Sequence, residues 1–202
     1  MVKELLTKKQ LTEKEFLGIV DAGIQAELSI GTEITLPNTL GTTDVWVVAG
    51  VNHDDAVGTV DLVTKGHVKV SDFSADDQLY EWSSARYWLT GKFIQGFSDA
   101  VRHAMKPVLT VEREESLFMI KHDDLVKLPS LTEVGMEGGD PTETPYPLFS
   151  SKESRGLSGT EYWVRDKIPD IEGGLAYYVN AGGGKEIGFC ESKRAYRPII
   201  RL

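Results

Sequence analysis

Apolar positions in the first part of the chain follow a helical period. In LTEKEFLGIVDAGIQAEL, residues 11–28, apolar side chains recur at steps of three and four, which places them on one helix face. Thr12 followed by Glu15 has the spacing of a capping box, in which each side chain binds a free amide at the helix start. We therefore predict an amphipathic helix from about Glu13 to Leu28. Its apolar stripe comprises Phe16, Ile19, Val20 and Ile24.

After Gly31 the pattern changes to that of β-strands. TEITLP alternates, and DVWVVAGV and TVDLVT are β-branched runs joined by the polar connector NHDDAVG, which predicts a hairpin. VLTVEREE and SLFMIKHDDLVKLP have the same character on either side of a turn. The chain closes with four short β-type segments between Gly-rich turns, namely EYWVRDK, LAYYVNAGG, KEIGFCES and YRPIIRL.

Two helices are predicted between these β-rich parts. Ser83 or Ser84 is placed to cap SARYWLTGKFIQGF, and Ser98 to cap a shorter helix that ends before Pro107. The apolar face of the first helix comprises Ala85, Trp88, Leu89 and Phe93.

A segment rich in Gly, Pro, Ser and Thr, residues 135–160, follows these elements. Just before it, Ser130 and Glu133 have capping-box spacing and predict one short helical turn. Structureless segments of this length are usually functional or disordered. We interpret it as an ordered, outward-facing loop. Its candidate contact residues are Tyr146, Phe149 and Arg155.

Together these patterns predict an α+β fold in two parts. Residues 1–28 form an N-terminal amphipathic docking segment. Residues 29–202 form a domain with two central helices, short strands and the long loop.

Composition and charge limit the classes of function. The 202 residues, 41% hydrophobic and 26% charged, suit one domain of ordinary size. A net charge of −9 without a long basic run argues against a nucleic-acid partner. The single cysteine, Cys190, suits a reducing compartment and excludes Cys-rich zinc sites. The first residues lack the apolar core of a signal peptide, and the longest apolar run is far below the ~20 residues of a membrane helix. We expect cytoplasmic synthesis and no membrane partner.

One short stretch, GVNHDDAVGTVDL (residues 50–62), concentrates groups that can bind metals or transfer protons. His53, Asp54, Asp55 and Asp61 lie within nine positions. A metal site needs ligands that converge on one point, whereas neighbouring side chains on a short loop point apart. Asn and Asp are also typical of turns, because their side chains bind nearby backbone amides. We therefore interpret the stretch as a turn and predict no catalytic, metal or cofactor-binding residues and no cofactor.

Several segments resemble a known family. Four patterns are similar to a domain of unknown function of Gram-positive bacteria and their phages, whose usual pattern ends in W-x-R-S … G-V-R-P-A-L. They are W-S-x-x-R-x-W-L-x-G-x-F, Y-W-x-R, Y-x-x-N-x-G-G and Y-R-P-I-I-R-L. The resemblance covers about residues 30–202, and Asp166 and Tyr196 depart from it. It is carried by Trp82, Ser84, Arg86, Trp88, Leu89, Phe93, Pro129, Glu133, Tyr162, Trp163, Arg165, Arg197 and Pro198.

That family is similar to C-type-lectin-like folds, in which the terminal strands pair and a long loop region lies above two helices. The resemblance implies a non-catalytic structural or binding protein, and most specifically a bacteriophage virion component: a capsid decoration, head-fibre or tail-associated surface protein. Its partners would be other virion proteins, copies of itself, or a host-surface glycan or protein, and its location would be the virion.

Other functions remain open beside this one. One alternative is an intracellular or surface interaction module of prophage origin. Another is a carbohydrate-binding lectin-like protein, although the Glu-Pro-Asn and Gln-Pro-Asp calcium triplets are missing. An enzyme is disfavoured: formylglycine-generating enzymes resemble this fold class but need paired cysteines, and GLSGT fails the G-x-S-x-G pattern.

Three expectations concern the folded chain. Trp88 and Trp163 should be largely buried, and Arg165 or Arg197 should be partly buried and paired within the domain. The N-terminal helix should dock on another subunit or a neighbouring virion protein, since monomers rarely tolerate an exposed apolar stripe. The alternative is that this helix packs on its own domain.

Overall fold

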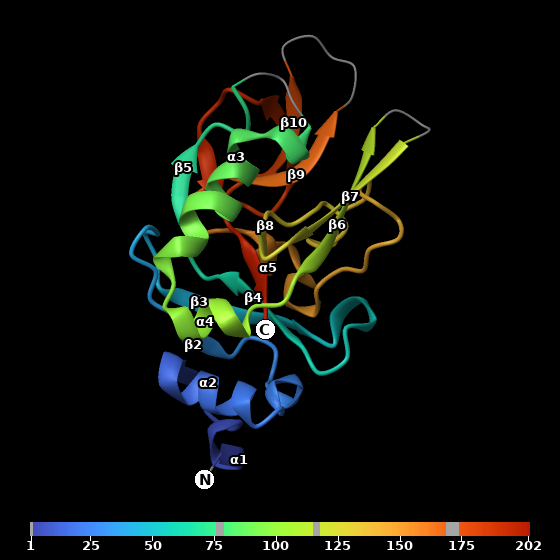
Figure 1. Cartoon of the computed structure of the whole chain (residues 1–202). Coiled ribbons are helices and arrows are strands. Elements are labelled where there is room, and N and C mark those ends of the chain that lie inside the picture. The colour runs from blue at the N-terminus through green and yellow to red at the C-terminus, as the bar shows by residue number, and fades with distance from the viewer. Residues whose placement is uncertain (1, 76–78, 115–117, 169–173) are drawn as a thin grey trace.

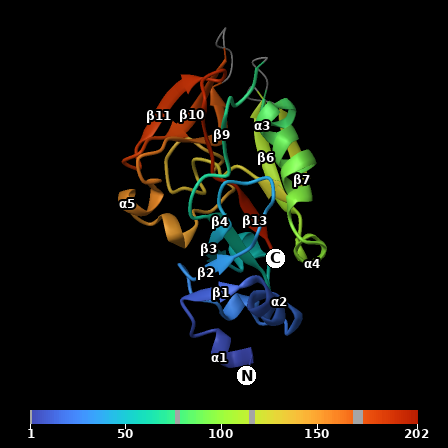
Figure 2. The ribbon, with the colours of Figure 1, turned by 90° about the vertical axis from the view of Figure 1, so that its left-hand side faces the viewer.

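The β-type segments of the sequence form three sheets, which combine with short helices into the mixed α/β architecture seen in Figures 1 and 2. This computed structural model describes residues 2–75, 79–114, 118–168 and 174–202. The largest sheet has the strand order β1-β2-β3-β4-β13-β8. Its strands are β1 (Gln10–Thr12), β2 (Glu33–Thr35), β3 (Val45–Val51), β4 (Val60–Thr64), β8 (Val126–Lys127) and β13 (Ile199–Arg201).

The second sheet has the order β11-β10-β9-β12-β5, and the third is the hairpin of β6 and β7. The strands of the second are β5 (Lys69–Ser71), β9 (Tyr162–Ile168), β10 (Leu175–Val179), β11 (Lys185–Phe189) and β12 (Arg194–Tyr196). The third comprises β6 (Val108–Glu114) and β7 (Phe118–Asp124), and the predicted turn between them, residues 115–117, lies outside the described residues.

Both hairpins predicted in the first two thirds of the chain are confirmed. β3 and β4 pair antiparallel with Val48 opposite Leu62, and β6 and β7 pair with Val111 opposite Lys121. The two larger sheets are joined by Arg197 and Pro198, because β12 belongs to the second sheet and β13 to the first. β13 lies between β4 and β8 and is antiparallel to both.

The helices are short, and their predicted caps are confirmed. Glu15 N donates to Thr12 Oγ1 at 3.3 Å and Thr12 N donates to the Glu15 carboxylate at 3.0 Å, while Ser83 and Ser98 cap α3 and α4. The helices are α1 (Val2–Leu5), α2 (Glu13–Asp21), α3 (Ser84–Tyr87), α4 (Asp99–Ala104) and α5 (Lys152–Arg155). The shorter turns are η1 (Gln25–Glu27), η2 (His53–Asp55), η3 (Tyr80–Trp82), the π-helical η4 (Trp88–Lys92), η5 (Phe93–Gly96) and η7 (Pro147–Phe149).

The N-terminal helix is shorter than predicted and packs inside the chain. Gly23 adopts a φ of +69°, so α2 ends at Asp21 rather than near Leu28. Phe16 and Ile19 are fully buried in the main hydrophobic core. Val20 and Ile24 are partly buried against it, and in Figure 1 α2 lies below α4 and β2. The docking prediction for Phe16, Ile19, Val20 and Ile24 is therefore wrong, because the chain covers its own stripe.

The tryptophan prediction is confirmed for Trp163, which is 0% exposed. Trp88 is half-buried, with its ring against Phe93 at 5.1 Å and Tyr196 at 5.9 Å. Cys190 is buried. Across the described ranges, no helix has the length and apolar character needed to cross a bilayer.

Candidate functional site

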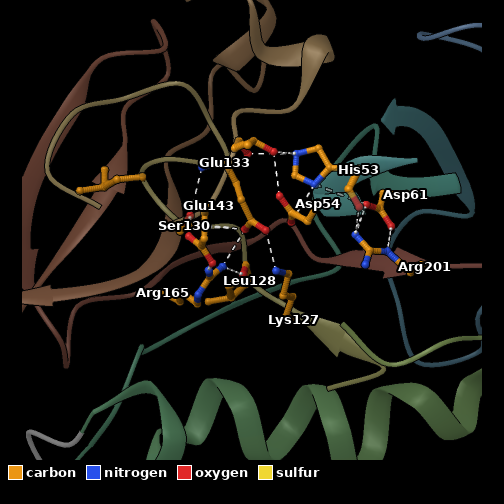
Figure 3. Close-up of polar contacts among 12 residues, drawn as sticks. His53, Asp54, Asp61, Lys127, Leu128, Ser130, Glu133, Glu143, Arg165 and Arg201 are labelled. Carbon is orange, nitrogen blue, oxygen red and sulfur yellow. Dashed lines mark hydrogen bonds and ion pairs between the residues drawn. The ribbon is translucent and has the colours of Figure 1, made fainter. Parts of the chain in front are cut away.

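Glu133 lies at the centre of a buried ionic cluster, shown in Figure 3. Its carboxylate accepts hydrogen bonds from Lys127 Nζ at 2.5 Å and Arg165 Nη1 at 2.7 Å, and from the Ser130 amide at 2.9 Å. Ser130 Oγ in turn accepts from Glu133 N at 3.0 Å, which completes the predicted capping box. Arg165 also binds Glu143, and Glu133 and Lys127 are 0% exposed. The cluster ties β8, the turn at 130–134 and β9 together.

The cluster makes the fold sensitive to acid. Burial alone would raise the pKa of Glu133, but the charges of Arg165 and Lys127 outweigh it and hold the pKa well below its ordinary value of 4.5. A carboxyl group whose pKa is lower in the folded state stabilises the fold at any pH above its unfolded-state pKa. This stabilisation is lost as the pH falls toward the folded-state pKa.

We therefore expect the urea midpoint of unfolding to fall as the pH is lowered below about 4.5. Glu133→Gln, which cannot ionise, should be less stable at pH 7 and should lose less stability between pH 7 and pH 3.5. If the urea midpoints of the wild type and this variant changed equally with pH, the acid sensitivity could not be assigned to Glu133.

The stretch around His53 is a hairpin connector, as predicted, but its histidine points inward. His53 is 6% exposed and stacks on Tyr146 with 3.8 Å between ring centroids. Its Nε2 lies 3.0 Å from the Thr144 carbonyl oxygen, and its Nδ1 lies 2.9 Å from Asp54 Oδ2 and 3.8 Å from Asp61 Oδ2. Both ring nitrogens therefore lie close to oxygen atoms, one of the long loop and the others of the connector and β4.

The connector is held in an unusual backbone conformation. Asn52, Asp54 and Asp55 have φ values of 49°, 52° and 60°, in the left-handed region that non-Gly residues rarely occupy. Arg201 Nη2 donates to the His53 carbonyl oxygen at 3.2 Å and Arg201 forms a two-point ion pair with the buried Asp61 at 2.6 and 2.7 Å. Backbone strain of this kind persists only where the surroundings fix it.

Thr144, His53 and Asp54 contain the groups of a hydrolase triad without its connectivity. In such a triad the histidine accepts the proton of the nucleophile, and the carboxylate orients the histidine. Here the Thr144 hydroxyl donates to Asp54 Oδ1 at 2.7 Å, so its proton is directed away from the ring. The three groups instead join the connector to the long loop.

Between the connector and the long loop lies an open hollow of about 460 Å³. Its carboxylates and hydroxyls suit polar or cationic partner groups. The lining residues are Val51, Asn52, His53, Asp54, Asp55, Thr142, Thr144, Pro145 and Pro147. Within the part of the chain that the structure describes, no group of three or more His, Cys, Asp or Glu side chains is arranged to hold a metal ion.

Replacing Asp54 by alanine is expected to lower the free energy of unfolding by about 1–2 kcal/mol more than replacing Asp55. Both residues have positive φ, so the backbone strain of alanine is matched, whereas only Asp54 binds Thr144 and approaches His53. Urea unfolding of both variants measures the difference. Equal losses would mean that the connector is held by its backbone alone.

Two candidate contact residues of the long loop are buried anchors, and the prediction that they face outward is wrong. Tyr146 and Phe149 are each 1% exposed, since Tyr146 stacks on His53 and Phe149 lies 5.1 Å from the Arg197 guanidinium. Arg155 is half-buried, and its Nη1 donates to Gly135 O at 2.7 Å. A loop poor in apolar residues needs such anchors to stay ordered.

The arginine prediction is confirmed. Arg165 is 3% exposed and pairs with two glutamates. Arg197 is 5% exposed and donates to the carbonyl oxygens of Thr64 and Arg155 at 3.2 and 3.0 Å. Lys127 and Glu143, which complete the cluster, were missed. The available signal for Lys127 was a lone charge in the apolar run LVKLP, which calls for a buried partner.

The family described as "Domain of unknown function (DUF6273)" matches residues 58–202. The comparison with curated proteins found no match, and the comparison with solved structures found none either. The matched region begins inside the β3–β4 connector and includes the ionic cluster.

Proposed function

Because the chain belongs to the family described as "Domain of unknown function (DUF6273)", we propose that it is a non-catalytic binding protein, and specifically a structural component of a bacteriophage particle. Its partners would be other particle proteins or a host-surface glycan or protein. The Gram-positive and phage setting and the C-type-lectin-like likeness belong to this proposal. They rest on the sequence resemblance described above.

The observation that carries the proposal is the hollow between the connector and the long loop. His53 and Arg201 fix the strained connector from inside, while Asp55 and Thr142 remain exposed at the rim. A surface that is ordered before binding loses little conformational entropy on contact, which favours recognition. The buried carboxylates Glu133 and Asp61 are already bound by Arg or Lys, so they support the scaffold.

A glycan ligand is the second candidate. The hydroxyls and carboxylates that line the hollow, such as Thr142 and Asp55, are groups that can hydrogen-bond a sugar. Titration of the purified chain with host cell-wall fragments, read by calorimetry, separates this candidate from protein contact.

Particles purified by density gradient from an induced culture that encodes the chain provide the main test. We expect wild-type chain in the particle band at a fixed ratio to the major particle protein, and at least about ten-fold less of Asp55→Arg. Asp21→Arg, which changes an exposed aspartate on α2, is the matched control and should be incorporated normally. A chain absent from particles would overturn the proposal.

A further inference from the structure

The outer edge of β11 is an open strand edge. β11 ends the five-stranded sheet, and among the described residues no strand pairs with its outer side. Asn180 N donates to Gly184 O and Cys190 N donates to Gly174 O, so the even-numbered positions direct their backbone groups toward β10. The amides and carbonyls of Lys185 and Ile187 therefore point outward.

The same strand exposes large apolar side chains. Ile187 is 50% exposed and Phe189 is 56% exposed, and both lie on one face because side chains alternate along a strand. An exposed apolar strand edge is a template for pairing with another chain.

On the opposite face, Arg194 lies across the sheet. Its guanidinium carbon is 3.7 Å from the Tyr178 ring centroid, and its nitrogens occupy the space where a Cβ on Gly188 would lie. Arg194 Nε pairs with Glu161 at 3.2 Å. Glu186 lies opposite Tyr178 in the β10–β11 register and shares this face with Gly188 and Arg194.

We propose that two copies of this chain associate through antiparallel pairing of β11 with β11, around a two-fold axis at Ile187. In this register Ile187 faces Ile187 of the second copy, and Phe189 packs on the methylene stem of Lys185 from the second copy. Glu186 of each copy faces Gly188 of the other, beside Arg194, so the charges are complementary. About four new backbone hydrogen bonds form, from the Ile187 and Phe189 amides of each copy.

The chain's own residues disfavour two other two-fold registers. A two-fold axis at Lys185 would place lysine opposite lysine, and like charges directly opposite each other destabilise a strand pair. An axis at Phe189 would run into the turn in which Ser192 N donates to Phe189 O. The contact is small, so we expect a dissociation constant on the order of 10–100 µM. This inference does not rest on the proposed function, since it concerns copies of this chain alone.

Cross-linking provides the position-specific test. A cysteine at position 187 would meet its copy at a Cα separation of about 5.5 Å, within disulfide range. We expect Ile187→Cys to form a covalent dimer under mild oxidation. The matched control is Val70→Cys, 51% exposed on β5 at the opposite edge of the same sheet, which should remain monomeric. The native Cys190 is buried.

Sedimentation velocity of the purified full chain measures the association itself. Wild type should show a concentration-dependent dimer. Ile187→Pro, which removes an outward amide and no bond to β10, should raise the dissociation constant at least about ten-fold, as should Glu186→Lys. A wild type that is monomeric up to about 0.5 mM, a dimer that survives Ile187→Pro, or equal cross-linking at positions 70 and 187 would each overturn the pairing. The result of the particle assay described above does not depend on this pairing.

Discussion

Replacing Arg165 by alanine is expected to lower the free energy of unfolding by about 3–5 kcal/mol. The substitution leaves the carboxylates of Glu133 and Glu143 without their shared cation, in a site where Glu133 is 0% exposed. Lys127 still pairs with Glu133, so one cation remains for two carboxylates, and such a buried imbalance of charge costs much more than the loss of one surface pair. Urea unfolding followed by tryptophan fluorescence measures the loss.

Two further variants locate the cause of that loss. Arg165→Lys keeps the charge but cannot reach both carboxylates with one planar group, so an intermediate loss is expected. Arg102→Ala removes a solvent-exposed pair with Asp99 and should cost less than about 1 kcal/mol. Similar losses for Arg165→Ala and Arg102→Ala would contradict the central role of the cluster.

Replacing Trp163 by alanine is expected to cost about 3–5 kcal/mol, the usual loss for a large core aromatic. The Trp163 ring packs against Phe73 and Tyr178 at 5.7 and 6.0 Å, and its Nε1 donates to Ser71 O at 3.2 Å. The change therefore opens a cavity and removes a hydrogen bond between β9 and β5. Thermal and urea unfolding both report the effect.

Two other tryptophans, Trp88 and Trp82, provide a graded control. Replacing the half-buried Trp88 by alanine should lower the free energy of unfolding less than replacing Trp163. Replacing Trp82, which is 44% exposed, should lower it least. A Trp82→Ala variant as unstable as Trp163→Ala would mean that burial does not determine the order.

Local signals in the sequence predicted much of the fold. Capping residues such as Thr12 and Ser98 act within one helical turn, and the β-branched run VWVVAGV lies within a single strand, so both signals can be recognised without tertiary structure. The length of α2 was overestimated, because the periodicity continued past Gly23 although the backbone did not.

The candidate site could be predicted only in part. The sequence shows that His53, Asp54 and Asp55 are adjacent. It does not show that the histidine points inward while Asp55 is exposed, because that arrangement depends on Thr144 and Arg201, which are distant in sequence. The covering of Phe16 and Ile19 likewise depends on elements far along the chain. Long-range packing of this kind leaves no periodic trace in one sequence.

The central place of β13 in the largest sheet has a consequence for synthesis on the ribosome. Arg201 pairs with Asp61, 140 positions earlier, and β13 fills the space between β4 and β8. While translation is in progress, the nascent chain exposes the inner edges of β4 and β8 until residues 199–201 leave the exit tunnel. Strand pairs between segments this far apart in the chain form late, so ribosome-bound chains that stop before β13 should be protease-sensitive and depend on chaperones.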